Sequence, residues 1–380
     1  MKIVIVAKEI VIQHQDRSVK ATAASSSDSR LVPWPSRPLA SSESATIQVG
    51  ATETDGQDVS LVEPDESTEQ AAGKHRPVTF RYQFAVPAGV QIARARIYIT
   101  RVGDLLSAPG WTSNQQWQVS QTYGIAPELI ACQANEIQLD VAEGWFCGSL
   151  GFTRRSNIYG NQLRLLSIIH VELEYGRILH ISTDDRWIWT FGGIVEAGLL
   201  DGETYDARAN LSIQQPGSIS WKRDLQVQQV LLSPSDEPIL DFDQSFVGWI
   251  RVQQMKGPAA ARIRFQFTEV LEKNGEIGTR PLRSAKCHDS AIFDGTDAGV
   301  RYWEPKFTFH GFHYVEFDAW PDATISMIAS NFVGVVSHSD IARTGHFHCL
   351  NPLLNRLHQS IVWSMRGSFV GIPPECPERD

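Results

Sequence analysis

The sequence predicts a mainly β protein, made of tandem β-sandwich or jelly-roll domains and ending in one helix. Short runs of alternating apolar and polar residues, bounded by Gly, Pro, Asn and Asp, recur up to about residue 350. A run with helical spacing comes after them. Of the 380 residues 42% are hydrophobic and 20% are charged, which suits folded cores and excludes a mostly disordered chain.

The alternating runs predict strands throughout the β region. The clearest runs cover residues 95–100, 168–175, 249–253 and 263–267. Residues 1–75 are expected to hold a first β block, with strands at 3–12 and 45–49, and a polar linker over 53–74. Two further β blocks are expected at 76–218 and 219–336, before a different segment at 337–380.

The segment from residue 351 onward predicts an amphipathic helix. Its apolar residues recur at helical spacing: Leu353, Leu354, Leu357, Ile361, Val362 and Met365. Asn351 suits the N-cap, Pro352 suits the first helical position, and Gly367 suits the end of the helix. A lone helix of this length is marginal in water, so its apolar face needs partner helices. We therefore expect a fragment that is cut at the entrance to a helical domain.

Charge, hydropathy and cysteine content exclude several classes of protein. The net charge of −9 does not favour a nucleic acid or an anionic membrane as partner. The apolar run at residues 3–7 is shorter than the ~7–15 residues of a signal peptide core, so a cytoplasmic chain is expected. The cysteines are widely spaced and are expected to be buried free thiols: Cys132, Cys147, Cys287, Cys349 and Cys376.

Residues 373–380 form the candidate site. They contain Glu375, Glu378 and Asp380 together with Arg379, on a backbone that three prolines stiffen. One carboxylic acid can protonate a glycosidic oxygen, a second carboxylate can activate water, and an arginine can bind sugar hydroxyls or lower a neighbour's pKa. A solvated charged loop has the same composition, so composition alone leaves both interpretations open.

Motifs in a fixed order carry a resemblance to a known family. They are APGWTS at 108–113 with QTY at 121–123, GWFCG at 144–148, DGETYDAR at 201–208, DFDQSFVGW at 241–249, LRSAK at 282–286 and WEPKFTFHGF at 303–312. NPLLN at 351–355 and IVWS at 361–364 then precede the 373–380 loop. From about residue 78 onward, the chain resembles the inverting bacterial and fungal α-L-rhamnosidases.

The resemblance implies a fold and a set of site residues. Fibronectin-like, jelly-roll and concanavalin-like β domains would precede a truncated (α/α)6 catalytic domain that begins at 337–380. Glu375 stands at a substrate-binding position, and Arg379 matches the arginine beside the general acid. The general acid would be Asp380 or the residue directly after it, and the general base would be a Glu beyond this sequence. The implied substrate is a rhamnosylated glycoside, with no cofactor, and this chain alone is expected to be inactive.

The sequence also departs from the family pattern. Glu375 replaces an Asp and adds one methylene, Pro374 replaces a Thr, and Glu378 replaces a Gln. The segment after Thr100 is shorter than in the family, which predicts a missing strand and an exposed sheet edge. A faulty gene model or a decaying gene would explain these departures.

Other residues have less specific interpretations. The carboxylates at 184–185 and 201–206 suit calcium or a solvated turn, and the solvated turn is favoured, so no metal site is predicted. His346 and His348 are expected on one face of a strand, and His310 and His313 beside a Gly311-Phe312 turn in packing or hydrogen-bonding roles. Most tryptophans are expected in sandwich cores, while Trp363 lies close to the candidate loop.

Two alternatives to the enzyme stay open at this point. The first is a non-catalytic carbohydrate-binding protein made of β-sandwiches. The second is an inactive remnant that neither binds nor cleaves a sugar.

Overall fold

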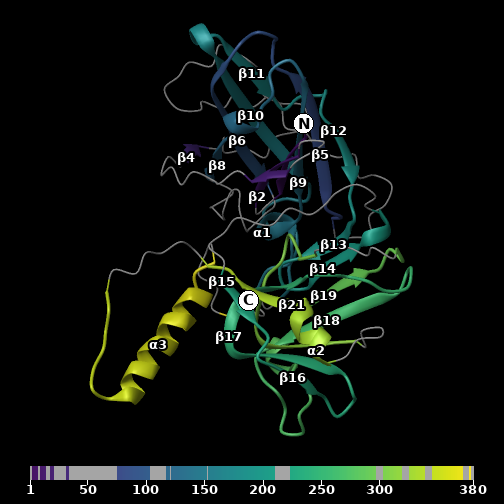
Figure 1. Cartoon of the computed structure of the whole chain (residues 1–380), viewed down its shortest axis with the longest axis vertical. Coiled ribbons are helices and arrows are strands. Elements are labelled where there is room, and N and C mark those ends of the chain that lie inside the picture. The colour runs from purple at the N-terminus through teal and green to yellow at the C-terminus, as the bar shows by residue number, and fades with distance from the viewer. Residues whose placement is uncertain are drawn as a thin grey trace. The chain divides into compact units, whose positions relative to one another are not determined.

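A computed structural model provides the structure of the chain (Figure 1). It describes residues 2–6, 9–13, 18–20, 31–33, 75–102, 117–119, 121–151, 153–209, 223–296, 303–318, 325–338, 345–370 and 376–377. The chain divides into two compact units. Unit 1 comprises residues 1–148, 155–192 and 216–219, and unit 2 comprises residues 149–154, 193–215 and 220–380.

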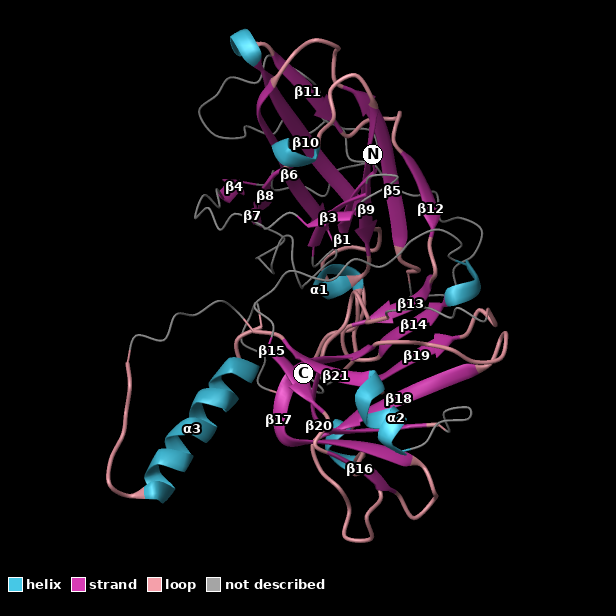
Figure 2. Ribbon diagram, in the orientation of Figure 1, coloured by secondary structure: helices cyan, strands magenta, loops and turns pink. Residues whose placement is uncertain are grey.

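Unit 1 is a β-sandwich (Figure 2). Its strands are β1 (Lys2–Val6), β2 (Glu9–Gln13), β3 (Ser18–Lys20), β4 (Leu31–Pro33), β5 (Val78–Ala85), β6 (Ile92–Val102), β7 (Trp117–Val119), β8 (Gln121–Gly124), β9 (Ala134–Val141), β10 (Arg164–Leu173), β11 (Ile178–Ser182) and β12 (Ile188–Phe191). The larger sheet has the order β12-β5-β9-β1-β2-β3, the second has the order β11-β10-β6-β8, and β4 pairs with β7. A short helix, α1 (Gly144–Cys147), follows β9.

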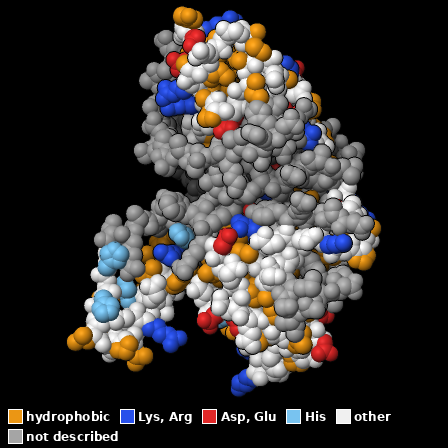
Figure 3. Space-filling model, in the orientation of Figure 1, with side chains coloured by type: hydrophobic (Ala, Val, Ile, Leu, Met, Phe, Trp, Pro, Cys, Tyr) orange, Lys and Arg blue, Asp and Glu red, His pale blue; other side chains and the backbone are white. Residues whose placement is uncertain are grey.

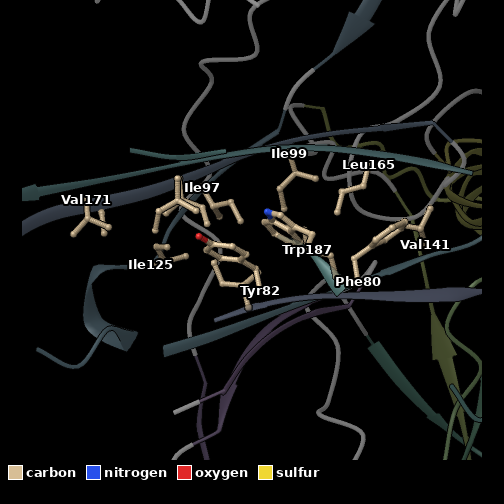
Figure 4. Packing of buried hydrophobic residues seen from close by; sticks show 14 of the residues in the cluster. Phe80, Tyr82, Ile97, Ile99, Ile125, Val141, Leu165, Val171 and Trp187 are labelled. Carbon is tan, nitrogen blue, oxygen red and sulfur yellow. The ribbon is translucent and has the colours of Figure 1, made fainter. Parts of the chain in front are cut away.

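The core of unit 1 lies between its two larger sheets. Alternate side chains of β5, β6, β9 and β10 point inward, because successive residues of a strand face opposite sides of the sheet. Phe80, Ile97 and Leu165 are fully buried there, and the ring of Trp187 stacks on Tyr82 with 5.2 Å between ring centroids (Figure 4). Side chains far apart in the sequence therefore build a single core.

In the described residues, unit 2 contains a nine-stranded sheet and two α-helices. Its elements are β13 (Ile194–Gly198), β14 (Gly202–Asp206), β15 (Arg223–Gln226), β16 (Gln229–Leu232), β17 (Pro238–Val252), β18 (Arg262–Thr268), β19 (His288–Ile292), β20 (His310–Phe317), α2 (Ile325–Asn331), β21 (Phe332–Val336) and α3 (Pro352–Gly367). The strand order is β13-β14-β19-β18-β20-β17-β21-β15, and β16 also pairs with β17.

The long strand β17 organises unit 2. Its first part pairs with β16, and it pairs with β20 on both sides of a register shift between Asp241 and Phe246. Its last part pairs with β21. Trp249 and Ile250 are both fully buried, although they point to opposite faces of the sheet. Buried phenylalanines from β18, β20 and β21 complete the core: Phe265, Phe267, Phe312, Phe317 and Phe332.

The structure confirms the mainly β fold class and the helix near the C-terminus. The clearest predicted strands coincide with β6, β10, β17 and β18, although the runs at 168–175 and 249–253 extend past the ends of β10 and β17. The run at 3–12 is divided between β1 and β2, because the chain reverses there into an antiparallel pair. The strand predicted at 45–49, the linker at 53–74 and the segment after Val102 lie outside the described residues.

Three local predictions were wrong. His346 and His348 lie in an irregular segment and not on a strand, and Gly311-Phe312 lies inside β20 and not in a turn. Cys132 is exposed, since it occupies a turn with a φ of 66°, and Cys349 and Cys376 are only half-buried, whereas Cys147 and Cys287 are buried as expected. Among the described helices, none is long and apolar enough to cross a membrane.

Candidate functional site

The helix that precedes the candidate loop, α3, begins with a well-formed N-cap. Asn351 adopts an extended conformation, and its side chain accepts a hydrogen bond from the backbone N–H of Leu353 at 2.9 Å. This contact satisfies one of the N–H groups that every helix leaves unpaired in its first turn. Pro352 occupies the first turn of α3, where it loses no hydrogen bond. The predicted cap is therefore confirmed.

A second asparagine fixes the chain that enters α3. The side-chain oxygen of Asn355 accepts from the N–H of Cys349 at 2.9 Å, and its NH₂ group donates to the carbonyl of Cys349 at 2.7 Å. The two bonds close a ring between a side chain and the backbone before the helix. The orientation of the first turn thus depends on Asn355 as well as on the cap.

The C-terminal end of α3 lies against β17. A Cβ atom added to Gly367 would come within 3.1 Å of Cγ2 of Val247, so the helix end approaches the strand closely. The helix ends at Gly367 as predicted, and Val370 is 4% exposed just beyond it. The residues before the candidate loop are therefore anchored to the core of unit 2.

The predicted site residues Glu375, Arg379 and Asp380 lie outside the described residues. Within the loop the structure describes Cys376 and Pro377, and both are half-buried. The roles of Glu375, Arg379 and Asp380 therefore stay predictions. At the described end of α3, the guanidinium of Arg366 lies 5.1 Å from the ring centroid of the half-buried Trp363.

The apolar face of α3 is exposed. Its large hydrophobic side chains lie 45–73% open to solvent: Leu353, Leu354, Leu357, Ile361 and Met365. Hydrophobic side chains also gather on the surface at the free end of this helix, at the lower left of Figure 3. A helix in a folded protein normally buries such a stripe, so α3 has the surface of a helix that packs against others.

The family-like motifs of the β region form a buried polar network in unit 2. The N–H of Glu203 donates to Oδ1 of Asp289 at 2.8 Å, and Oε2 of Glu203 accepts from the N–H groups of Lys306 and Phe307 at 2.8 and 3.0 Å. A Cβ on Gly202 would lie 1.8 Å from the carbonyl oxygen of His288, so only glycine fits beside this network. These motifs therefore join three separate chain segments.

A histidine completes this network. Nε2 of His310 lies 3.1 Å from Oδ1 of Asp289, and Nδ1 lies 3.4 Å from Sγ of Cys287. The hydrogen-bonding roles predicted for His310 and His313 are confirmed, because Nε2 of His313 lies 3.0 Å from Oδ1 of Asp241. The side chains of His310 and Asp289 are 1% and 0% exposed, which denies a substrate access to this cysteine, histidine and aspartate.

A second motif contact supports the same interpretation. Trp249 donates its indole N–H to Oε2 of Glu304 at 2.9 Å, and Nε of Arg251 lies 3.3 Å from the same oxygen. The family-like DFDQSFVGW and WEPKFTFHGF segments thus meet through buried side chains. Their polar residues stabilise the sheet.

Three of the carboxylates considered for calcium have arginine partners. Asp184 pairs with Arg186, and Asp206 pairs with Arg208, through Nη2 at 2.5 and 2.8 Å. Asp201 pairs with Arg154. Within the described ranges, no group of three or more His, Cys, Asp or Glu side chains is arranged to hold a metal ion.

Sequence reasoning did not anticipate the network around Asp289. Asp289 was not singled out, and Glu203 was considered only within a motif and a carboxylate-rich turn, because neither strand order nor strand pairing can be read from their positions. The Cys287-His288-Asp289 run at the start of β19 was the available signal. A polar triplet at the start of an apolar alternating run indicates side chains that enter a core.

Three protein-family models match consecutive parts of the chain. The α-L-rhamnosidase N-terminal domain matches residues 88–238, and the bacterial α-L-rhamnosidase concanavalin-like domain matches residues 232–338. The bacterial α-L-rhamnosidase six-hairpin glycosidase domain matches residues 342–380.

Individual relatives agree with these matches. The α-L-rhamnosidase of Streptomyces avermitilis is 31% identical over 79% of this chain and 32% of its own length. The crystal structure of native α-L-rhamnosidase from Aspergillus terreus has a TM-score of 0.76 and 37% identity, over 85% of this chain and 41% of that one. The Streptomyces avermitilis enzyme complexed with L-rhamnose has a TM-score of 0.72 and 30% identity, over 80% and 32% of the two chains.

Matches to two rhamnosidase β domains and, after them, to a six-hairpin glycosidase domain define the class as a glycoside hydrolase. The chain belongs to the bacterial α-L-rhamnosidase family, as the motif resemblance indicated. It spans 32–39% of the length of the curated relatives it matches.

Proposed function

We propose that the whole protein hydrolyses terminal α-L-rhamnosides with inversion of configuration. The observation that carries the proposal is the six-hairpin glycosidase match at 342–380, which contains α3 and the acidic loop. The L-rhamnose complex of the similar Streptomyces avermitilis enzyme supports rhamnose as the sugar.

The proposed mechanism assigns different tasks to the loop residues. Glu375 would bind rhamnose hydroxyls, and Arg379 would hold the neighbouring general acid in position. Asp380 or the residue after it would protonate the leaving oxygen, while a carboxylate elsewhere in the catalytic domain would activate water. Inverting enzymes keep the two carboxyl groups ~6.5–9.5 Å apart to admit that water.

In this proposal residues 337–380 are the start of the catalytic domain, and the exposed stripe of α3 would pack against further helices. The four-part division of the chain at 1–75, 76–218, 219–336 and 337–380 also stays a prediction. The 380-residue chain by itself would not hydrolyse a rhamnoside, because it would lack the carboxylate that activates water.

The test is activity on an aryl α-L-rhamnoside. We expect no turnover from the 380-residue chain. We expect turnover from a longer product of the same gene, if the transcript continues past Asp380, with β-L-rhamnose as the first product seen by NMR. Turnover by the short chain, or no rhamnoside hydrolysis by the longer one, would contradict the proposal.

Matched variants of the longer product separate binding from chemistry. Glu375→Gln is expected to weaken hydrolysis at least tenfold, because a sugar-binding carboxylate is lost. Glu378→Gln restores the family's residue beside the site and is expected to retain activity. Equal losses in both variants would count against the role of Glu375.

The concanavalin-like match at 232–338 favours a second candidate, a carbohydrate-binding protein without catalysis. Glycan-array binding by residues 76–340, together with no activity in any gene product, would support this alternative.

A further inference from the structure

The buried site of His310 needs a positive charge. Oδ1 of Asp289 accepts from the N–H of Glu203 at 2.8 Å and lies 3.1 Å from Nε2 of His310, so this oxygen acts as a hydrogen-bond acceptor. An ionised carboxylate that is 0% exposed is strongly disfavoured unless a cation lies beside it. The imidazole of His310 is the group in contact with Asp289 that can supply that cation.

Both ring nitrogens of His310 have a partner that can accept. If the ring is doubly protonated, Nε2–H donates to Asp289 and Nδ1–H donates to Sγ of Cys287, which lies 3.4 Å away. A neutral ring would leave Asp289 without a countercharge. The face of the ring stacks on Phe267 from β18, with 4.1 Å between centroids, and this apolar contact excludes water from that side.

The other charged groups around this site come from neighbouring elements. On β19, burial and the charges of Arg264, Lys286 and His310 lower the pKa of His288, against the raising effect of Asp289, so the neighbouring imidazole is disfavoured as a second cation. From β14, the carboxylate of Glu203 is bonded to the backbone before β20. The salt bridge Asp289–His310 is therefore the central charge pair of the network.

We propose that Asp289, His310 and Cys287 form a charged lock inside unit 2, meaning a set of contacts that holds its strands together while His310 is protonated. These contacts break, and the strands separate locally, when that proton leaves at alkaline pH. The lock joins β14, β19 and the start of β20, which are not consecutive in the sequence. Its role is conformational, since burial excludes a substrate.

The pKa of His310 gives the direction of the pH dependence. Burial alone would lower this pKa, but the attraction and hydrogen bonds of Asp289 and Cys287 outweigh burial and raise it from 6.5 to about 10. The unfolded chain therefore loses this proton at a lower pH than the folded chain does. The stabilisation is complete below pH ~6.5 and is lost as the pH rises toward 10, at a limit of about tenfold in the unfolding constant per pH unit.

NMR of histidine-labelled, full 380-residue chain tests the charge directly. We expect the His310 ring, assigned by its absence in His310→Gln, to carry protons on both nitrogens at pH 7.5 and to titrate above pH 8. Asp289→Asn removes the countercharge with little change of shape, and the ring should then titrate at pH 7 or below. Asp241→Asn is the matched control, because it alters the other carboxylate–histidine pair and should leave His310 unchanged.

Hydrogen exchange in peptides from β18 and β20 tests the lock itself. After correction for intrinsic rates, opening in the unmodified chain should increase with pH between 7 and 9.5, and His310→Gln should remove most of that increase. If Asp289→Asn does not fold, the unmodified chain and Cys287→Ser still report the charge on the ring. A neutral His310 at pH 7.5, or the same pH slope with and without His310, would overturn the proposal.

Discussion

At the scale of single residues, a histidine pair makes unit 1 sensitive to acid. His170 and His180 face each other on β10 and β11, with ring centroids 4.3 Å apart, and the ring of Tyr98 packs on the other side of His170. Burial and the nearby His180 lower the pKa of His170 to about 4. The folded chain therefore holds a neutral ring at a pH where the unfolded chain is already protonated.

The stability of unit 1 is predicted to fall as the pH drops from about 6.5 to about 4, because the unfolded state binds the proton first. His170→Gln should remove part of this dependence, up to about tenfold in the unfolding constant per pH unit. His180→Gln should raise the pKa of His170 in an NMR titration. His346→Gln, which alters an exposed residue of unit 2, should change neither result.

Single residues also show where sequence reasoning stops. The cap at Asn351 follows from local chemistry and was predicted correctly. The contact between Asp289 and His310 depends on β18 lying between β19 and β20, and that strand order is not written in either residue's neighbours. The burial of Cys287 was predicted, but its position against an imidazole was not.

At the scale of elements, α3 differs from the strands of the two cores because its apolar face is exposed. Its regular spacing made its boundaries predictable, since the helix begins and ends where Pro352 and Gly367 indicated. Its packing was not predictable in the same way. The exposed stripe shows that helical periodicity specifies which side chains share a face, while the partner of that face depends on other parts of a protein.

The exposed stripe predicts that the 380-residue chain self-associates. Leu357→Gln and Ile361→Gln should each reduce association in analytical ultracentrifugation, because each removes an apolar side chain that is 55% exposed. Neither change should alter the melting temperature measurably, since surface substitutions usually cost less than about 0.5 kcal/mol. Val370→Gln is the contrasting variant, because it places an amide at a buried position and should lower stability. Unchanged association in both surface variants would assign the self-association to another surface.

At the scale of the whole molecule, two cores carry the fold. The mainly β class was predictable because alternation records which face of a strand is buried. The division into two compact units depends on contacts between distant strands, such as the pairing of β5 with β9, and no local pattern records such contacts.

The two cores are predicted to respond separately to core mutations. Phe80→Ala should destabilise unit 1 by about 3–5 kcal/mol, through lost burial and the cavity that remains. Hydrogen exchange in peptides of β17 and β18 should stay unchanged. Phe265→Ala is the reciprocal variant, which should affect unit 2 and leave β6 and β10 protected. If either variant opened both cores equally, the two units would form one cooperative structure.

The buried network around Asp289 changes what a motif search detects in such a chain. The DGETYDAR and WEPKFTFHGF motifs and Asp289 describe how the sheet of unit 2 is assembled, whereas the proposed chemistry resides in a few residues near position 380. A gene could lose every reacting group and still score highly on those signatures. Genome surveys that count such matches therefore count scaffolds, and the number of working enzymes has to be established from the acidic loop and the rest of the helical domain.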